Sequence, residues 1–124
     1  MARLPRLSAA GLPHLVEQGG HNGQAIFVDV ADRIAYRAAL SQAAAESGVA
    51  IHAYCLDATR VLLLVTPRDS EGLSRMMQRV GRRYTAVFNR RNGRSGTLWS
   101  GRFRTTVLQP ETCFIAAMCH VESD

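Results

Sequence analysis

Arginine is the residue type through which this sequence could do chemistry. All 15 of its basic residues are Arg, none is Lys, and the formal net charge is +5. Nine of these arginines lie between residues 75 and 104, a stretch that contains no Asp or Glu. A guanidinium can hold a phosphate through two parallel hydrogen bonds, so clustered arginines without carboxylates indicate a surface for a polyanion. A solvated helix surface is the alternative, and we favour nucleic acid over it.

Cysteine and histidine, the usual metal ligands and nucleophiles, are poorly arranged for either task. The three cysteines are an odd number and lack C-x-x-C spacing, which argues against a disulfide framework and a zinc site and predicts free thiols. His14, His21 and His120 have no ligand spacing. No local metal motif is therefore expected.

Length and hydropathy predict one soluble domain. The 124 residues, 47% of them hydrophobic, suit a single domain over residues 1–124 with a real core, whose C-terminus is either natural or truncated. No run of 18 apolar residues is present and the N-terminus lacks a signal-peptide pattern, so no membrane contact and a cytoplasmic location are expected.

Two predicted helices organise the arginines. The first should cover Val30–Ser47, with Asp29 as N-cap and Gly48 as the C-terminal stop. The second should begin after Pro67, capped by Asp69 or Ser70, and end near Arg91. Its apolar residues recur at helical spacing on one face, which predicts a core side and an opposite side rich in arginine. The residues of the apolar face are Leu73, Met76, Met77, Val80, Tyr84, Val87 and Phe88.

Strand patterns surround these helices. They cover residues 14–18, 25–28, 50–56, 60–66 and 97–108, the last broken at Gly101, and a final helix should follow Pro110. Residues 60–66 are apolar on both faces beyond the first residue, as in a covered central strand. The order predicts an α+β fold, a ferredoxin-like α/β sandwich in which helices pack on a central antiparallel sheet.

Several motifs resemble those of a known family. The most specific block spans residues 81–84, 88–91, 93–99 and 101–103, and residues 63–67 add to it. It resembles the REP-associated tyrosine transposases of the HUH single-tyrosine superfamily, over nearly the whole chain. The resemblance implies cutting and rejoining of single-stranded DNA. It also implies a His-apolar-His triplet that holds Mg²⁺ or Mn²⁺, a nucleophilic tyrosine on a late helix, and a basic surface for DNA.

Two of these three requirements are missing from the sequence. The positions that match the two histidines are Arg60 and Leu62, and the tyrosine position is Cys113. Leucine has no donor atom for a metal, and a protonated guanidinium repels a cation. The resemblance therefore implies a degenerate catalytic site without a metal cofactor. A Cys113 thiolate is not expected to attack a phosphodiester without that metal.

The leading hypothesis is a catalytically silent, transposase-like protein that binds single-stranded or hairpin DNA. One alternative is an active metal-dependent transposase with a rearranged site. Another is an inactive dimer partner of an active paralogue, or a homodimer. The expected DNA contacts are Arg75, Arg79, Arg82, Arg83, Arg90, Arg94, Arg102 and Arg104.

Overall fold

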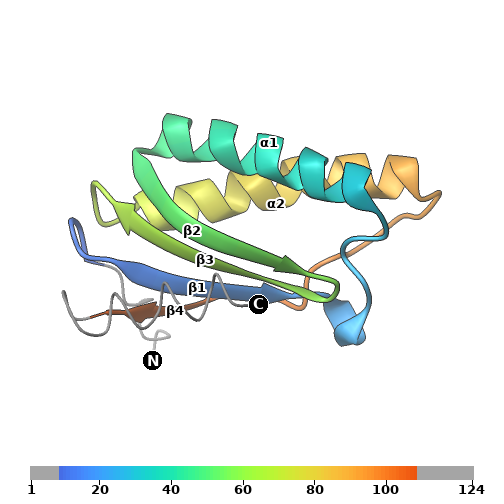
Figure 1. The fold of residues 1–124 in the computed structure, drawn as a ribbon, viewed down its shortest axis with the longest axis horizontal. Coiled ribbons are helices and arrows are strands. Elements are labelled where there is room, and N and C mark those ends of the chain that lie inside the picture. The colour runs from blue at the N-terminus through green and yellow to red at the C-terminus, as the bar shows by residue number, and fades with distance from the viewer. Residues whose placement is uncertain (1–8, 109–124) are drawn as a thin grey trace, which may run out of the picture.

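The computed structural model describes residues 9–108, which form four strands and two long helices. The elements are β1 (His14–Gly19), a short 3-10 helix η1 (His21–Gly23), α1 (Val30–Ser47), β2 (Val49–Asp57), β3 (Arg60–Pro67), α2 (Gly72–Arg91) and β4 (Arg104–Val107). The strands form one antiparallel sheet in the order β2-β3-β1-β4. Helices α1 and α2 lie side by side on one of its faces (Figure 1). The predicted α+β sandwich is confirmed.

Helix α1 begins and ends where the sequence predicts. The backbone nitrogen of Asp32 donates to Oδ1 of Asp29 at 3.0 Å, which satisfies a free N–H of the first turn. Gly48 takes a left-handed conformation with φ 69° and closes the helix. No helix within residues 9–108 combines the length and the apolar composition needed to cross a membrane.

Helix α2 ends at Arg91 as expected, but its start differs from the prediction. The N-cap is Glu71, which makes no side-chain capping bond, instead of Asp69 or Ser70. Asp69 still serves the helix start, because its carboxylate accepts a hydrogen bond from the backbone nitrogen of Glu71 at 3.0 Å. The turn before α2 therefore places the acidic side chain just outside the first helical residue.

Strand β3 is the covered central strand that its composition predicts. Val61, Leu63 and Val65 lie in the main core beneath the helices. Leu62 and Leu64 point to the opposite face, where they pack with Cys55 of β2. The sheet is thus apolar on both of its faces at this strand.

One predicted strand segment is wrong, and another is confirmed only in part. Residues 25–28 form no strand. The apolar pattern there comes from burial, since the side chains of Ile26 and Phe27 both lie in the core. The backbone nitrogen of Ile26 donates to the carbonyl of Ala58. Of residues 97–108 only β4 is a strand. The earlier part is irregular, with Gly101 at φ 75°. The helix expected after Pro110 lies outside the described residues.

An aromatic cluster joins the two helices to these irregular segments. Tyr36 of α1 and Tyr84 of α2 meet edge-to-face, with ring centroids 5.2 Å apart. Phe27 lies 5.6 Å from Tyr36, and Trp99 lies 6.2 Å from both tyrosines. The hydroxyl of Tyr84 donates to the carbonyl of Ile26, and burial raises the pKa of Tyr84 above its usual range. Tyr84 is therefore a neutral core residue, as its position on the apolar face predicts.

Tyr84→Phe should lower the free energy of unfolding by about 1–2 kcal/mol, because the buried Ile26 carbonyl loses its donor while ring packing is retained. Urea unfolding would measure the change. Tyr54→Phe is the matched control, since Tyr54 is 41% exposed, and its effect should stay within about 0.5 kcal/mol. Equal effects of the two substitutions would contradict this role for the Tyr84 hydroxyl.

Candidate nucleic-acid interface

Helix α2 is the scaffold that carries most of the predicted DNA contacts. Its core side is formed by six of the seven residues expected from the helical spacing, and Val87 is half-buried. The side chains that project away from this core include Arg75, Arg79, Arg82, Arg83 and Arg90. The amphipathic pattern therefore positions the arginines as predicted, but their charge depends on what lies next to them.

Three of the predicted contacts on α2 pair with acids from other parts of the chain. Arg79 and Arg83 both bind Oε1 of Glu46 on α1, at 3.3 and 2.8 Å. The hydrogen bond from Arg83 lowers the pKa of Glu46, and Arg79 adds to this effect. Arg75 lies 3.3 Å from Asp69 and also donates to the carbonyl of Ser47. Residues 75–104 contain no acid in the sequence, but in the folded chain acids from other segments lie next to these three arginines.

Arg91 and Arg94 connect the C-terminal end of α2 to neighbouring segments of the chain. Arg91 contacts Asp29 at 3.3 Å and the buried Asp32 at 3.0 Å. Burial opposes ionisation of Asp32, but the Val28 N–H and Arg91 outweigh it and lower the pKa of its carboxyl. Within residues 9–108, Arg94 donates only to neutral groups, the side chains of Asn89 and Gln24 and the carbonyl of Thr97. No carboxylate of this part of the chain therefore neutralises its positive charge.

Four of the predicted contacts are exposed and form no ion pair within residues 9–108. They are Arg82, Arg90, Arg102 and Arg104. Arg82 and Arg90 are two turns apart on α2, Arg102 precedes β4, and Arg104 opens β4. A guanidinium that no carboxylate neutralises can give its full charge to a phosphate. These four, together with Arg94, are the candidate nucleic-acid interface.

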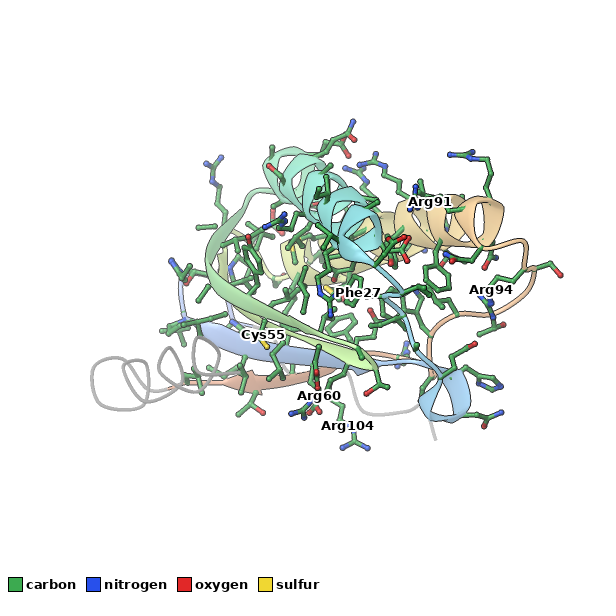
Figure 2. All side chains as sticks on the ribbon, turned by 45° about the vertical axis from the view of Figure 1, so that its right-hand side comes forward. Phe27, Cys55, Arg60, Arg91, Arg94 and Arg104 are labelled. Carbon is green, nitrogen blue, oxygen red and sulfur yellow. The ribbon has the colours of Figure 1, made fainter. Side chains whose placement is uncertain are left out.

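The predicted arginines do not all share one face of the molecule. Arg104 is the β-partner of Glu17, which is in turn the β-partner of Leu62, so all three side chains lie on one side of the sheet. Figure 2 shows Arg104 and Arg60 on the side of the sheet away from the helices, while Arg91 lies among the helices. The candidate interface therefore wraps from α2 around the segment before β4 to the sheet edge.

The positions that match the family's histidines do not fit a divalent cation. Arg60 lies 3.1 Å from Glu17 and 3.9 Å from Asp57, so its own guanidinium occupies the nearby carboxylates. Leu62 is 3% exposed and packs in the apolar cluster with Cys55 and Leu64. No group of three His, Cys, Asp or Glu that could hold a metal occurs among residues 9–108. Cys113, the matching tyrosine position, lies outside the described residues.

Comparison with known proteins supports the fold. No protein-family model matches the sequence, and no curated protein matches it. A REP-associated tyrosine transposase bound to a REP hairpin has a similar structure, with a TM-score of 0.73 and 15% identity, over 98% of this chain and 70% of that chain. A proposed transposase from Deinococcus radiodurans R1 has a TM-score of 0.63 and 19% identity, over 98% and 97%. The resemblance to transposases is thus confirmed for the fold.

Addition of Mg²⁺ or Mn²⁺ should leave the thermal unfolding midpoint where it stands in the presence of a chelator. A cation bound specifically to the folded state would raise that midpoint by mass action, but Arg60 already engages the carboxylate of Glu17. Differential scanning fluorimetry measures the shift. A rise with Mn²⁺ that disappears in Glu17→Gln would contradict the assignment and place a cation at β1 and β3.

Proposed function

We propose that this protein binds single-stranded or hairpin DNA through its unneutralised arginines and does not cut it. The observation that carries the proposal is a set of four exposed arginines that have no carboxylate partner in the part of the chain that the structure describes, Arg82, Arg90, Arg102 and Arg104. Their exposure lets each one release counterions from a phosphate, which is the main source of affinity in sequence-independent binding. Arg94, which donates to the side chain of Gln24, adds a fifth positive charge to the candidate interface.

The fold makes DNA the favoured polyanion. One similar structure is a transposase bound to a REP hairpin, so a protein with this fold can bind a DNA hairpin. Arg75, Arg79 and Arg83 are also expected near DNA, but each must leave or share its acid before it can bind a phosphate. We therefore expect these three to contribute less than the unpaired arginines.

The proposed loss of catalysis rests on the sheet face where the family's metal would lie. An imidazole pair on one strand would hold the cation that polarises the scissile phosphate. Here Arg60 is engaged with Glu17, and Leu62 is buried in an apolar cluster. Without the cation, the DNA would be held at this surface without being activated for attack.

Arg82→Ala should weaken binding to a single-stranded oligonucleotide severalfold and reduce the salt dependence by about 0.7 log units per tenfold change in salt, the value for one phosphate contact. Arg79→Ala is the matched control on the same helix. It removes the same charge, but Arg79 is already paired with Glu46. Fluorescence anisotropy over a range of salt concentrations measures both variants.

A smaller effect of Arg82→Ala than of Arg79→Ala would contradict the division into paired and unpaired arginines. Binding of the unmodified protein that does not weaken with salt, or no binding to single-stranded, hairpin or duplex DNA, would reject the proposed function itself.

Hairpin DNA incubated with the protein and Mg²⁺ or Mn²⁺ should remain uncut, and a chelator should not change its affinity. Both results are expected because Arg60 and Leu62 provide no metal ligand. A denaturing gel detects nicking, and Cys113→Ala is the control variant. Metal-dependent nicking that this substitution abolishes would instead identify an active transposase with a rearranged site.

Self-association is a second candidate function, with one observation in its favour. Among the strands of residues 9–108, β2 is at the edge of the sheet, and the exposed Tyr54 lies on it. An exposed edge strand can pair with the same strand of a second copy. Sizing chromatography with light scattering distinguishes a monomer from a homodimer, and Tyr54→Glu should shift a dimer toward the monomer.

A further inference from the structure

Gln18, near the end of β1, is a buried side chain with an unmet hydrogen-bonding need. It is 9% exposed, and its Oε1 atom has no partner within the part of the chain that the structure describes. A buried polar atom without a partner costs about as much as a lost hydrogen bond, so native proteins rarely retain one without reason. The position of Gln18 supplies a reason, because it lines three adjoining hollows.

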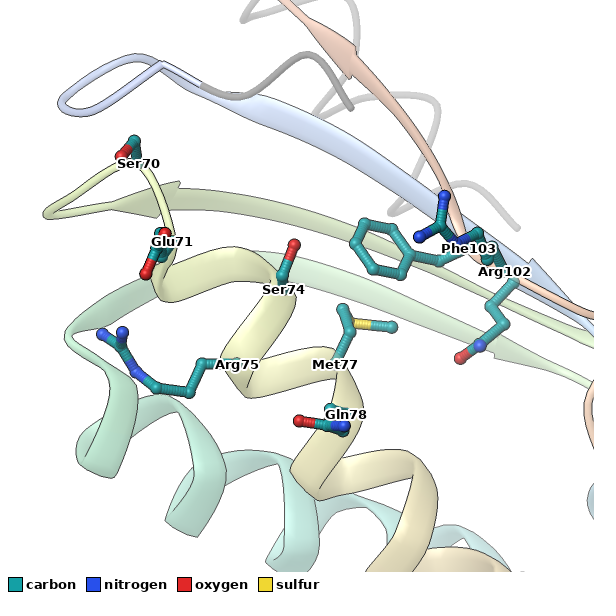
Figure 3. A pocket seen from close by; sticks show the side chains of 9 residues that line it. Ser70, Glu71, Ser74, Arg75, Met77, Gln78, Arg102 and Phe103 are labelled. Atoms are coloured by element: carbon teal, nitrogen blue, oxygen red, sulfur yellow. The ribbon is translucent and has the colours of Figure 1, made fainter. Parts of the chain in front are cut away.

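The first two hollows form a groove along α2. They have volumes of about 590 and 620 Å³ and share Gln18, Met77 and Gln78 as lining residues. Figure 3 shows Met77 and Gln78 projecting from α2 into the first hollow, while Phe103 enters from the segment that leads into β4. Volumes of this size are typical of sites for small ligands, and the two together suit a ligand with more than one chemical part.

Positive charge lines this groove. Arg82 lines the second hollow, and Arg102 lines the first and also the third, which has a volume of about 230 Å³. Both guanidiniums are exposed, and neither forms an ion pair within residues 9–108. The carboxylates on the lining are Glu71, in the first hollow, and Glu17, in the third, where Arg60 engages it. The groove therefore favours an anion next to Arg82 and Arg102.

Trp99 provides a fixed flat wall in the second hollow. Its indole N–H donates to the carbonyl of Gly81 at 3.4 Å, and its ring packs on the aromatic cluster. The side chain is half-buried, so part of its surface remains open to the hollow. A rigid aromatic surface beside arginines is a common platform for an unpaired base, because every base has a π-face that can stack.

We propose that this groove binds one unpaired nucleotide of a DNA strand. The base lies against Trp99, the amide of Gln18 contacts the edge of the base, and Arg82 and Arg102 hold the flanking phosphates. A side-chain amide offers a donor and an acceptor together, which matches the edges of unpaired bases. This inference rests on the proposed function, since it identifies the nucleotide subsite of the same DNA-binding surface.

The sequence contains a single tryptophan, so the intrinsic fluorescence of the full chain reports on the groove directly. Two labelled hairpins are compared, identical except that one carries an unpaired nucleotide with its base and the other an abasic site there. The hairpin with the base should quench Trp99 emission and bind roughly 5- to 150-fold more tightly, the range expected for stacking of one base. The abasic hairpin should leave the emission nearly unchanged.

Gln18→Leu separates recognition from structure. Leucine fills similar space and removes the unsatisfied atom, so the unfolding midpoint should stay constant or rise. The affinity ratio of the two hairpins should fall toward one. Arg37→Ala is the control variant, since Arg37 is an exposed arginine of α1 that lines a different hollow, and the ratio should not change.

Three results would overturn the inference. Salt-dependent binding of both hairpins with equal affinity and unchanged Trp99 emission would leave the proposed function intact and reject the nucleotide subsite. No binding of either hairpin by anisotropy would reject both. A ratio that Gln18→Leu leaves at its full value would reject Gln18 as the contact. If that variant does not fold, the comparison of the two hairpins on the unmodified protein still decides.

Discussion

The contact between the Tyr84 hydroxyl and the Ile26 carbonyl holds together parts of the chain that secondary structure alone would leave apart. A buried hydroxyl needs an acceptor, and here that acceptor lies in the irregular segment between η1 and α1. The same ring packs against Tyr36 of α1 and faces Trp99 in the segment before β4. One side chain of α2 thus sets the position of α1 and of two loops. The walls of the groove beside α2 are consequently fixed by the core, even though most of the polar residues that line it come from the surface.

The helices and β3 were predictable because their signals are local and periodic. Asp29 and Gly48 mark the ends of α1 through capping and backbone conformation, and both depend only on neighbouring residues. Residues 25–28 failed for the opposite reason. Their apolar side chains suggest a strand, but Phe27 packs on the distant rings of Tyr36 and Tyr84, and Ile26 lies in the same core. None of the described strands pairs with them. A short run of apolar residues is expected both for a buried irregular segment and for a strand, and only the tertiary structure distinguishes the two.

The candidate site was predictable in its residue types but not in its electrostatics. Clustered arginines could be counted from the sequence, yet Glu46 lies 33 and 37 positions from the two arginines that it neutralises. No pattern within residues 75–104 reports that approach, so paired and unpaired arginines look alike until α1 is placed beside α2. Gln18 left no signal either. It is one polar residue in an alternating strand, and its significance comes from three hollows that meet only in the folded chain. Arg60 and Leu62 were identified by resemblance, and the structure adds the ion pair and the apolar cluster around them.

The apolar cluster on the side of the sheet opposite α1 and α2 bears on how this sequence can change by mutation. Leu62 is enclosed with Cys55 and Leu64, and Cys55 is its direct β-partner across the strand pair. A single mutation that placed an imidazole at position 62 would bury a polar ring among these side chains, at a cost of about 1–3 kcal/mol before any ion could compensate for it. That is a large fraction of the stability of a small domain. A histidine at position 62 would therefore be selected against on grounds of stability alone, whatever it could bind.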